Sequence, residues 1–252
     1  EKFSIEKGTP LLGKIDRALF DAQELGADTL VAPEGTLPLN YKLNRPSVVD
    51  FFSGGFRWIN GRQRASLFFF NSGQQEYSEV IDKHRLVPLG EWVPSLIGGI
   101  LKSGFSAVGS LSPGDSSRLL TVKDSSLAAV ICYEISDSRA ISKAVSEGAE
   151  WILSISNLDP YPVILQKQFL SMAQMRSIEN SRDFVSVSNT GPTALIRSSG
   201  KIETLFPSSN ELIKTVNVDL YKSSNLFTYF KDKALFSILL ISFFVTISLR
   251  SR

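Results

Sequence analysis

The sequence contains one cysteine, Cys132, and one histidine, His84, among its 252 residues. A single cysteine excludes an internal disulfide framework and a cysteine-rich zinc site. A single histidine argues against a Ser-His-Asp triad and against a metal site built from several histidines. Any chemistry that this chain performs must therefore use cysteine, lysine and carboxylate side chains.

A strong charge of either sign is also absent, because 27 basic and 25 acidic residues leave a formal net charge of +2. Nucleic acid is therefore not an expected partner, since its binding domains carry a clear basic excess. The hydrophobic content of 43% is ample for a core, and the length suits one large domain or two small ones. The first residue is Glu1 and no signal peptide is visible, so we expect a piece of a longer protein or a processed chain.

The most informative stretch is the apolar run over residues 128–131, which ends directly at Cys132. Such a run, followed by a polar and helix-compatible segment, is typical of a strand buried on both faces of a parallel sheet. Ligands bind beyond the carboxyl ends of such strands, so Cys132 is a candidate nucleophile. A lone buried cysteine is more often an inert small hydrophobic residue, and this stretch alone leaves both interpretations open.

Two other segments place chemistry-bearing side chains in turns. Glu34 follows a predicted strand at 29–32, where the commoner interpretation is a solvated turn carboxylate. Lys83 and Glu91 lie in the loop 82–94, whose prolines and glycine restrict its shape. Basic residues in a loop are usually solvated, but a loop of fixed shape that carries a lysine and a glutamate can also form a site.

Strands and helices alternate along the chain, and this pattern predicts an α/β layered domain. Helices are predicted over residues 10–25, 136–148 and 162–180. Strands are predicted over residues 29–32, 67–70, 77–81, 128–131, 151–156, 184–188, 193–196 and 212–218. The second and third of these strands flank a glycine-containing loop and predict a hairpin, whereas the Gly- and Ser-rich residues 95–118 indicate a surface excursion.

The tail differs from the rest of the chain, because residues 234–249 carry no charge and are rich in Leu, Ile and Phe. At about 1.5 Å per residue this run is slightly short for a hydrocarbon core of about 30 Å. Snorkelling of Lys233 and Arg250 would extend its reach. The run and its basic ends predict a membrane-spanning helix over residues 234–250, in preference to a buried core helix.

Three motifs occur in order along the chain: Val31-Ala32-Pro33-Glu34, the segment 83–91, and Cys132-Tyr133-Glu134. Together they resemble the nitrilase (carbon–nitrogen hydrolase) superfamily, whose triad is Glu-Lys-Cys. The longer pattern Lys-x-Arg-Leu-Val-Pro-x-Gly-Glu-x-Val-Pro, over residues 83–94, resembles the apolipoprotein N-acyltransferase family. Residues 155–157 and 172–176 with Glu179 match that family too, so the resemblance covers nearly the whole chain.

The resemblance implies a fold and a domain division. A nitrilase-like α-β-β-α sandwich, with two sheets inside and helices outside, would form a catalytic domain over residues 1–222. A linker over 223–233 and the C-terminal transmembrane helix at 234–250 would follow. The family's N-terminal membrane helices and the first strand of its nitrilase domain lack a counterpart, so we expect a fragment. The run 158–162, Leu-Asp-Pro-Tyr-Pro, departs from the family's Asp-Ala-Trp-Phe, which puts the local substrate contacts in question.

The resemblance also implies catalytic roles for three motif residues. Cys132 would attack an acyl ester as the nucleophile. Lys83 would favour its thiolate and hold the oxyanion of the tetrahedral intermediate. Glu34 would act as the general base that takes the thiol proton and returns it to the leaving group.

Supporting roles are implied for three neighbours. Glu91 and Glu134 would orient Lys83 and tune its charge. Tyr133, which follows the nucleophile, would contribute its backbone N–H to the oxyanion site. The resemblance implies no metal and no organic cofactor.

The implied reaction is the transfer of a fatty acyl chain from a membrane phospholipid, through a Cys132 thioester, to the N-terminal amine of a diacylglyceryl-cysteine lipoprotein. The implied location is the bacterial plasma (inner) membrane, with the catalytic domain on the extracytoplasmic side. Two alternatives stay open: a nitrilase-type amidase that hydrolyses a small amide, and a non-catalytic membrane-tethered scaffold. The 83–94 pattern and the apolar tail favour the acyltransferase over the amidase.

Overall fold

The computed structural model describes residues 8–92, 111–123, 125–206, 213–223, 227 and 232–250. Within them, strands form a four-stranded sheet of order β1-β2-β3-β4 and a six-stranded sheet of order β10-β9-β8-β7-β6-β5. The strands are β1 (Thr29–Ala32), β2 (Asp50–Ile59), β3 (Arg62–Phe70), β4 (Glu79–Asp82), β5 (Leu119–Val122), β6 (Ser125–Ile131), β7 (Trp151–Ser156), β8 (Phe184–Ser188), β9 (Thr193–Ile196) and β10 (Ile202–Phe206).

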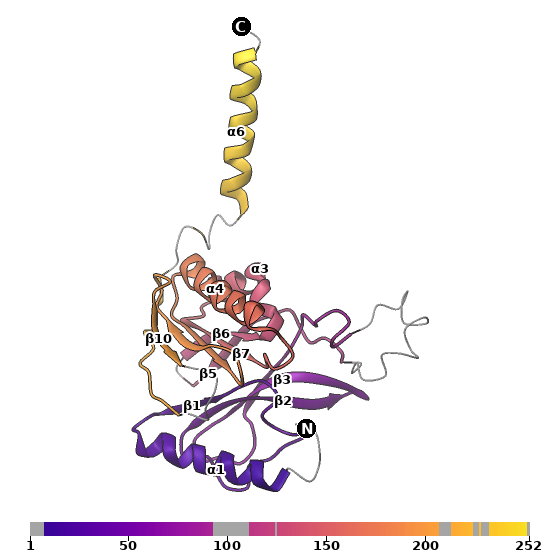
Figure 1. The fold of residues 1–252 in the computed structure, drawn as a ribbon, viewed down its shortest axis with the longest axis vertical. Coiled ribbons are helices and arrows are strands. Elements are labelled where there is room, and N and C mark those ends of the chain that lie inside the picture. Colours follow the sequence, from indigo (N-terminus) through magenta and orange to yellow (C-terminus); the bar gives the residue numbers. More distant parts are fainter. Residues whose placement is uncertain are drawn as a thin grey trace.

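The two sheets pack face to face, and helices cover their outer faces (Figure 1). The helices are α1 (Gly8–Glu24), the 3-10 turn η2 (Cys132–Ser136), α3 (Ser138–Ser146), α4 (Val163–Asn180) and α6 (Asp232–Arg250). Helix α1 lies on the four-stranded sheet, whereas α3 and α4 lie on the six-stranded sheet. The predicted α-β-β-α sandwich is therefore confirmed.

Alternation along the strands explains the layers, because successive side chains of a strand point to opposite faces. In β3, Leu67 and Phe69 enter the cluster between the sheets, while Phe68 and Phe70 enter the cluster under α1. In β6 the same alternation sends residues 127, 129 and 131 between the sheets and residues 128 and 130 toward α3. Strand β6 is thus apolar on both faces, as its run of apolar residues predicts.

The strand directions bring several carboxyl ends to one edge of the sandwich. Strands β6, β7 and β8 are mutually parallel, and β1 is parallel to β2. Strand β4 runs in the same direction as β2, because each is antiparallel to β3 between them. The segments that follow β1, β4, β6 and β7 are the ones that build the candidate site.

Several predicted elements need correction. The hairpin is confirmed as β3 and β4, but the long strand β2 was not predicted, because its central Gly54 and Gly55 interrupt the apolar pattern. The strand predicted at 212–218 is wrong, because described residues 213–218 form no strand. Of the predicted surface excursion at 95–118, residues 95–110 lie outside the described part of the chain.

The tail forms helix α6, which stands apart from the two sheets in Figure 1 and exposes apolar side chains such as Phe236 and Leu240. No described helix combines the length and the apolar character that a membrane crossing requires. The tail is helical as predicted, but the membrane span predicted at 234–250 is not found among the described helices. The domain boundaries at 222 and 233 stay predictions.

Candidate active site

Glu34 lies in the turn directly after β1, where Gly35 adopts a positive φ of 72°. Strand β2 passes so close to this turn that a Cβ added to Gly54 would meet the Cα of Glu34 at 2.4 Å. Only glycine allows this approach of two backbones. Gly54 interrupts the apolar pattern of β2, so the strand was not predicted from the sequence. The same residue allows the Glu34 turn to pack closely against β2.

Lys83 directly follows β4, and its side chain is fully buried. Its Nζ donates to Glu34 Oε1 at 3.0 Å and to Glu91 Oε1 at 2.6 Å. Burial alone would lower the pKa of Lys83, but interactions with Glu34, Cys132 and Glu91 together outweigh burial and raise it. Lys83 is therefore a permanent buried cation between two carboxylates.

Glu91 belongs to a tight turn that its own carboxylate closes. Glu91 Oε2 accepts the N–H of Val87 at 2.8 Å, and the N–H of Glu91 donates to the carbonyl of Val87 at 2.9 Å. Leu89 lies at the tip of the turn with a positive φ of 63°. The fixed loop shape predicted from the prolines and glycine thus aims one glutamate oxygen at Lys83.

Cys132 lies directly after β6 as the first residue of η2, buried and with a positive φ of 51°, a conformation uncommon for a residue with a side chain. Burial is the main cause that raises the pKa of its thiol, and the charge of Glu34 adds to it. A hydrogen bond with Glu34 also favours the neutral thiol, while Lys83 acts in the opposite direction. The expected influence of Lys83, which favours the thiolate, is thus present but is outweighed, and the pKa of the Cys132 thiol lies above its ordinary value.

Asn157 and Asn189 hold the second oxygen of Glu34 in place. The backbone N–H of Asn157, just after β7, donates to Glu34 Oε2 at 2.9 Å. Asn189 Nδ2 donates to Asn157 Oδ1 at 2.6 Å, and Asn189 Oδ1 accepts the N–H of Leu158 at 3.0 Å. The resemblance included Asn157 but not Asn189. The only feature of the sequence that could have indicated Asn189 is its position directly after strand β8.

Glu134 does not have the contacts expected of a partner of Lys83. Its carboxylate, 1% exposed, accepts from Arg118 Nη1 at 2.9 and 3.0 Å and from the N–H of Ile131 at 2.8 Å. The backbone N–H and ring Nδ1 of His84 both lie 2.6 Å from Glu134 Oε1. Burial would raise the pKa of Glu134, but these donors outweigh it and lower it. Glu134 therefore acts on Lys83 only indirectly, by accepting the backbone N–H of His84, the residue that follows Lys83.

Tyr133 is half-buried in the η2 turn, and the guanidinium of Arg85 lies 5.6 Å from the centroid of its ring. This distance is within the range of a cation–π contact. The oxyanion role of the Tyr133 backbone N–H stays a prediction.

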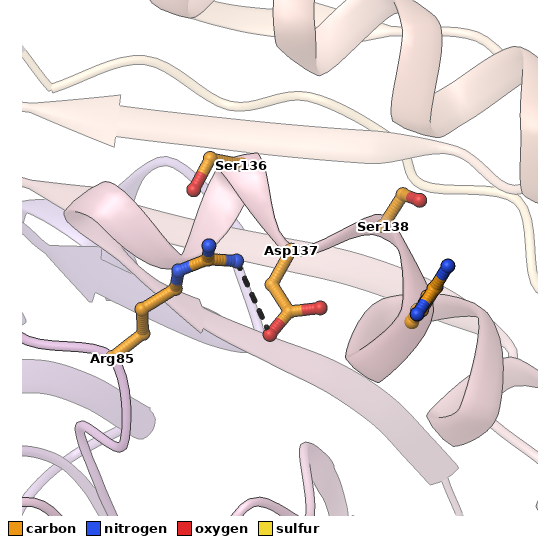
Figure 2. Close-up of a pocket in the computed structure, with 5 residues that line it drawn as sticks. Arg85, Ser136, Asp137 and Ser138 are labelled. Carbon is orange, nitrogen blue, oxygen red and sulfur yellow. Dashed lines mark ion pairs between the residues drawn. The ribbon is translucent and has the colours of Figure 1, made fainter.

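A polar hollow of about 480 Å³ lies beside this turn. Figure 2 shows its lining side chains, with Arg85 and Asp137 forming an ion pair at 3.5 Å. The hollow is lined by Arg85, Ser136, Asp137, Ser138 and Arg139. It does not include the cysteine or the buried lysine, so it is separate from the candidate active site. Among the described residues, no group of three or more His, Cys, Asp or Glu side chains could hold a metal ion.

The structure thus brings Glu34, Lys83, Glu91 and Cys132 together from segments that lie up to 98 positions apart in the sequence. A neutral thiol beside a carboxylate can lose its proton during attack on an electrophile. A fixed buried cation beside them can stabilise an oxyanion. The arrangement is suited to nucleophilic acyl transfer.

Comparison with known proteins agrees with this geometry. The chain is 47% identical over 241 residues to an apolipoprotein N-acyltransferase of Prochlorococcus marinus, which covers 96% of this chain and 49% of the relative. It is 49% identical over 214 residues to the enzyme of the same name from Parasynechococcus marenigrum, covering 84% of this chain and 46% of the relative. The chain therefore spans about half the length of these curated relatives. No family model matches it.

Among solved structures, two of an amidase from Nesterenkonia resemble this fold. One, described as an amidase of the nitrilase superfamily, has a TM-score of 0.60 at 14% identity, covering 80% of this chain and 81% of the other. The second has a TM-score of 0.62 at 13% identity, covering 92% and 90%. At such identities the likeness concerns the fold alone. Over about half of their length, this chain is a homologue of the apolipoprotein N-acyltransferases, built on a nitrilase-superfamily fold.

Proposed function

We propose that this chain carries the acyl-transfer site of an N-acyltransferase, with Cys132 as nucleophile, Glu34 as general base and Lys83 as the oxyanion-binding cation. The observation that carries the proposal is the buried Lys83 ammonium, 3.0 Å from Glu34 and 2.6 Å from Glu91, beside the only thiol of the chain. The relationship to apolipoprotein N-acyltransferases supports the choice of reaction.

In the first half-reaction, the sulfur of Cys132 attacks the ester carbonyl of a phospholipid acyl chain while Glu34 takes the thiol proton. Removal of the proton during attack suits a thiol whose pKa is raised by burial and by Glu34. Lys83 stabilises the oxyanion of the tetrahedral intermediate, and the backbone N–H of Tyr133 is its proposed second donor. Cleavage of the C–O bond gives the Cys132 thioester, and Glu34 returns its proton to the departing lysophospholipid alcohol.

In the second half-reaction, the free α-amino group of a diacylglyceryl-cysteine lipoprotein attacks the thioester. Glu34 takes a proton from the amine as the C–N bond forms, and the C–S bond then breaks. The proton passes to the departing sulfur, which restores the neutral Cys132 thiol and leaves an amide. Glu91 supports both steps by holding Lys83 through a second charge-assisted hydrogen bond beside that of Glu34.

The location that fits these substrates is the bacterial plasma membrane, with the catalytic domain on its extracytoplasmic side. A phospholipid donor and a lipid-modified acceptor both reside in a membrane. An impermeant lysine reagent applied to intact cells should therefore label the catalytic domain. Labelling of that domain only after cell lysis would contradict this location.

The test of the reaction is to trap the first half-reaction, which runs without acceptor in a two-step transfer. Detergent-solubilised protein is mixed with phospholipid labelled in its acyl chain, and the protein is analysed by mass spectrometry. We expect one acyl group, sensitive to neutral hydroxylamine and absent from Cys132→Ala. Hydrolysis of small amides with no transfer from phospholipid would favour the amidase, and no turnover of either substrate class would favour the scaffold.

A further inference from the structure

Arg118 is a buried arginine that the sequence motifs do not include. It lies directly before β5, is 1% exposed, and its backbone carbonyl accepts the N–H of Ala129 in β6 at 2.8 Å. Its guanidinium reaches in two directions. Nη1 donates to both oxygens of Glu134 at 2.9 and 3.0 Å, and Nη2 donates to the carbonyl of Asp82 at 2.9 Å. Nη2 also donates to the carbonyl of Asp115.

The other two partners of Arg118 are close neighbours of reacting groups. Asp82 directly precedes Lys83, and Glu134 is two residues after Cys132. Glu134 also accepts the N–H of Ile131, so it clamps the residue on the other side of Cys132 at 2.8 Å. One planar guanidinium thereby joins the end of β4, in the four-stranded sheet, to the turn after β6, in the six-stranded sheet.

The joint is rigid for three physical reasons. The guanidinium is planar and permanently charged, so its donors have fixed directions. Its hydrogen bonds to Glu134 are charge-assisted and shielded from water. Cys132 itself has a φ of 51°, and an uncommon backbone conformation persists only where its surroundings determine it.

We propose that Arg118 is a positioning residue: through Glu134 and the Asp82 carbonyl it holds the thiol of Cys132 against Glu34 and Lys83. Its consequence for acyl transfer rests on the proposed function, but the position of the thiol can be measured without any substrate. Because the chain has one cysteine, alkylation of this protein by iodoacetamide reports Cys132 alone.

The first experiment measures the rate of Cys132 alkylation against pH in the full chain. The charged or titratable groups that act on this thiol are Glu34, Lys83, Glu91 and Tyr161. We expect the wild-type midpoint to lie above about 8.5, the value of an ordinary thiol. In Arg118→Gln the turn relaxes away from Glu34, so the midpoint should fall by at least about one pH unit toward that ordinary value.

The matched control is Arg182→Lys, because Arg182 is equally buried and bonds to backbone carbonyls, including that of Ala149 at 2.8 Å, outside the site. It should leave the midpoint unchanged. Circular dichroism at the assay temperature identifies the folded samples. If Arg118→Gln does not fold, Arg118→Lys replaces it, since lysine keeps the charge but lacks the planar fork. Folded Arg118 variants with the wild-type midpoint would overturn the proposal.

The second experiment is a double-mutant cycle with Arg118→Gln, Glu134→Gln and the combined variant. If both residues act as one unit, the combined variant should shift the midpoint no further than either single variant. If the midpoint shifts of the two single variants add in the combined variant, Arg118 does not act on Cys132 through Glu134. Where acyl transfer is measurable, kcat should fall about 10- to 100-fold in each variant while KM changes little.

The two hypotheses can fail separately. A shifted midpoint in a protein without acyl transfer would contradict the proposed function and support the positioning role. Normal acyl transfer with a normal midpoint in a folded Arg118→Lys or Arg118→Gln variant would support the proposed function and overturn the positioning role.

Discussion

Two clusters of carboxylate and basic side chains lie near the Cys132 turn, and they differ in the hydrogen-bond partners of their carboxylates. In the reactive cluster, the cation Lys83 lies between Glu34 and Glu91. In the bracing cluster, the carboxylate of Glu134 lies between Arg118 and His84. The reactive cluster shares one cation between two anions, whereas the bracing cluster surrounds one anion with several donors.

This difference in arrangement fits the roles proposed for the two clusters, proton transfer in the reactive cluster and positioning in the bracing cluster. Glu134 accepts from two side chains and from backbone N–H groups. Glu34 accepts from Lys83 and from the N–H of Asn157 and still bonds with the Cys132 thiol. A carboxylate that retains a bond to a titratable proton can exchange it, whereas a fully occupied one acts as an anchor.

The largest effect is expected in the reactive cluster, from Lys83→Met. Removing the cation leaves the oxyanion without its charged partner, so the acyl-transfer rate should fall about 10³-fold. Steady-state transfer from labelled phospholipid measures the loss. A variant that retains activity within about tenfold of wild type would place the oxyanion elsewhere.

The next effect is expected in the bracing cluster, from Glu134→Gln. Loss of a buried partner leaves Arg118 without its counter-charge, so the free energy of unfolding should fall by about 3 kcal/mol. Urea unfolding followed by circular dichroism measures this change. Arg182→Lys, which breaks no carboxylate pair, is the comparison variant. An unchanged free energy of unfolding in Glu134→Gln would contradict the structural role given to the bracing cluster.

A smaller effect is expected from Glu91→Ala, which removes one of the two carboxylates of the reactive cluster. Its charge-assisted bond to Lys83 stabilises by about 2 kcal/mol, so turnover should fall about 30-fold. The fold should remain intact, because the glutamate is at the edge of the site and partly exposed. Turnover equal to that of wild type would reduce Glu91 to a loop residue.

The smallest effect concerns the pH dependence of stability. The pKa of Glu134 is lowered from its ordinary value of 4.5, so its stabilisation is present above that value and is lost as pH falls through the folded-state pKa. The pKa of His84 is raised from 6.5, chiefly by its hydrogen bond to Glu134, so its stabilisation is present below 6.5 and is lost as pH rises through the raised value.

The gap in stability between wild type and Glu134→Gln should therefore be widest from about pH 4.5 to 6.5 and should narrow on both sides. Asp82 and Asp137, whose pKa values are also lowered, stay in both proteins and cancel in the difference. Urea midpoints measured at several pH values test this shape. A gap independent of pH would mean that the two titrating groups are not coupled in the folded state.

Local patterns in the sequence account for the layers and for much of the site. The unbroken apolar run before Cys132 predicts a strand buried on two faces, and β6 is apolar toward both the other sheet and α3. The turn after residues 29–32 predicts a carboxylate at a strand end, which is where Glu34 lies. These inferences succeed because period and turn chemistry are local properties of the chain.

Other features depend on residues that only the folded chain brings together. Arg118 meets Glu134 and the carbonyl of Asp82 across two sheets, and no spacing in the sequence indicates that contact. The direction of the Cys132 pKa depends on burial and on Glu34, 98 positions away, more than on Lys83. The apolar run of the tail predicted a helix by itself, and α6 is that helix. Composition and period predicted most of the elements, although not β2. The packing of the two sheets decided which charged side chains meet, because Coulomb energies and desolvation depend on distances that the linear order does not contain.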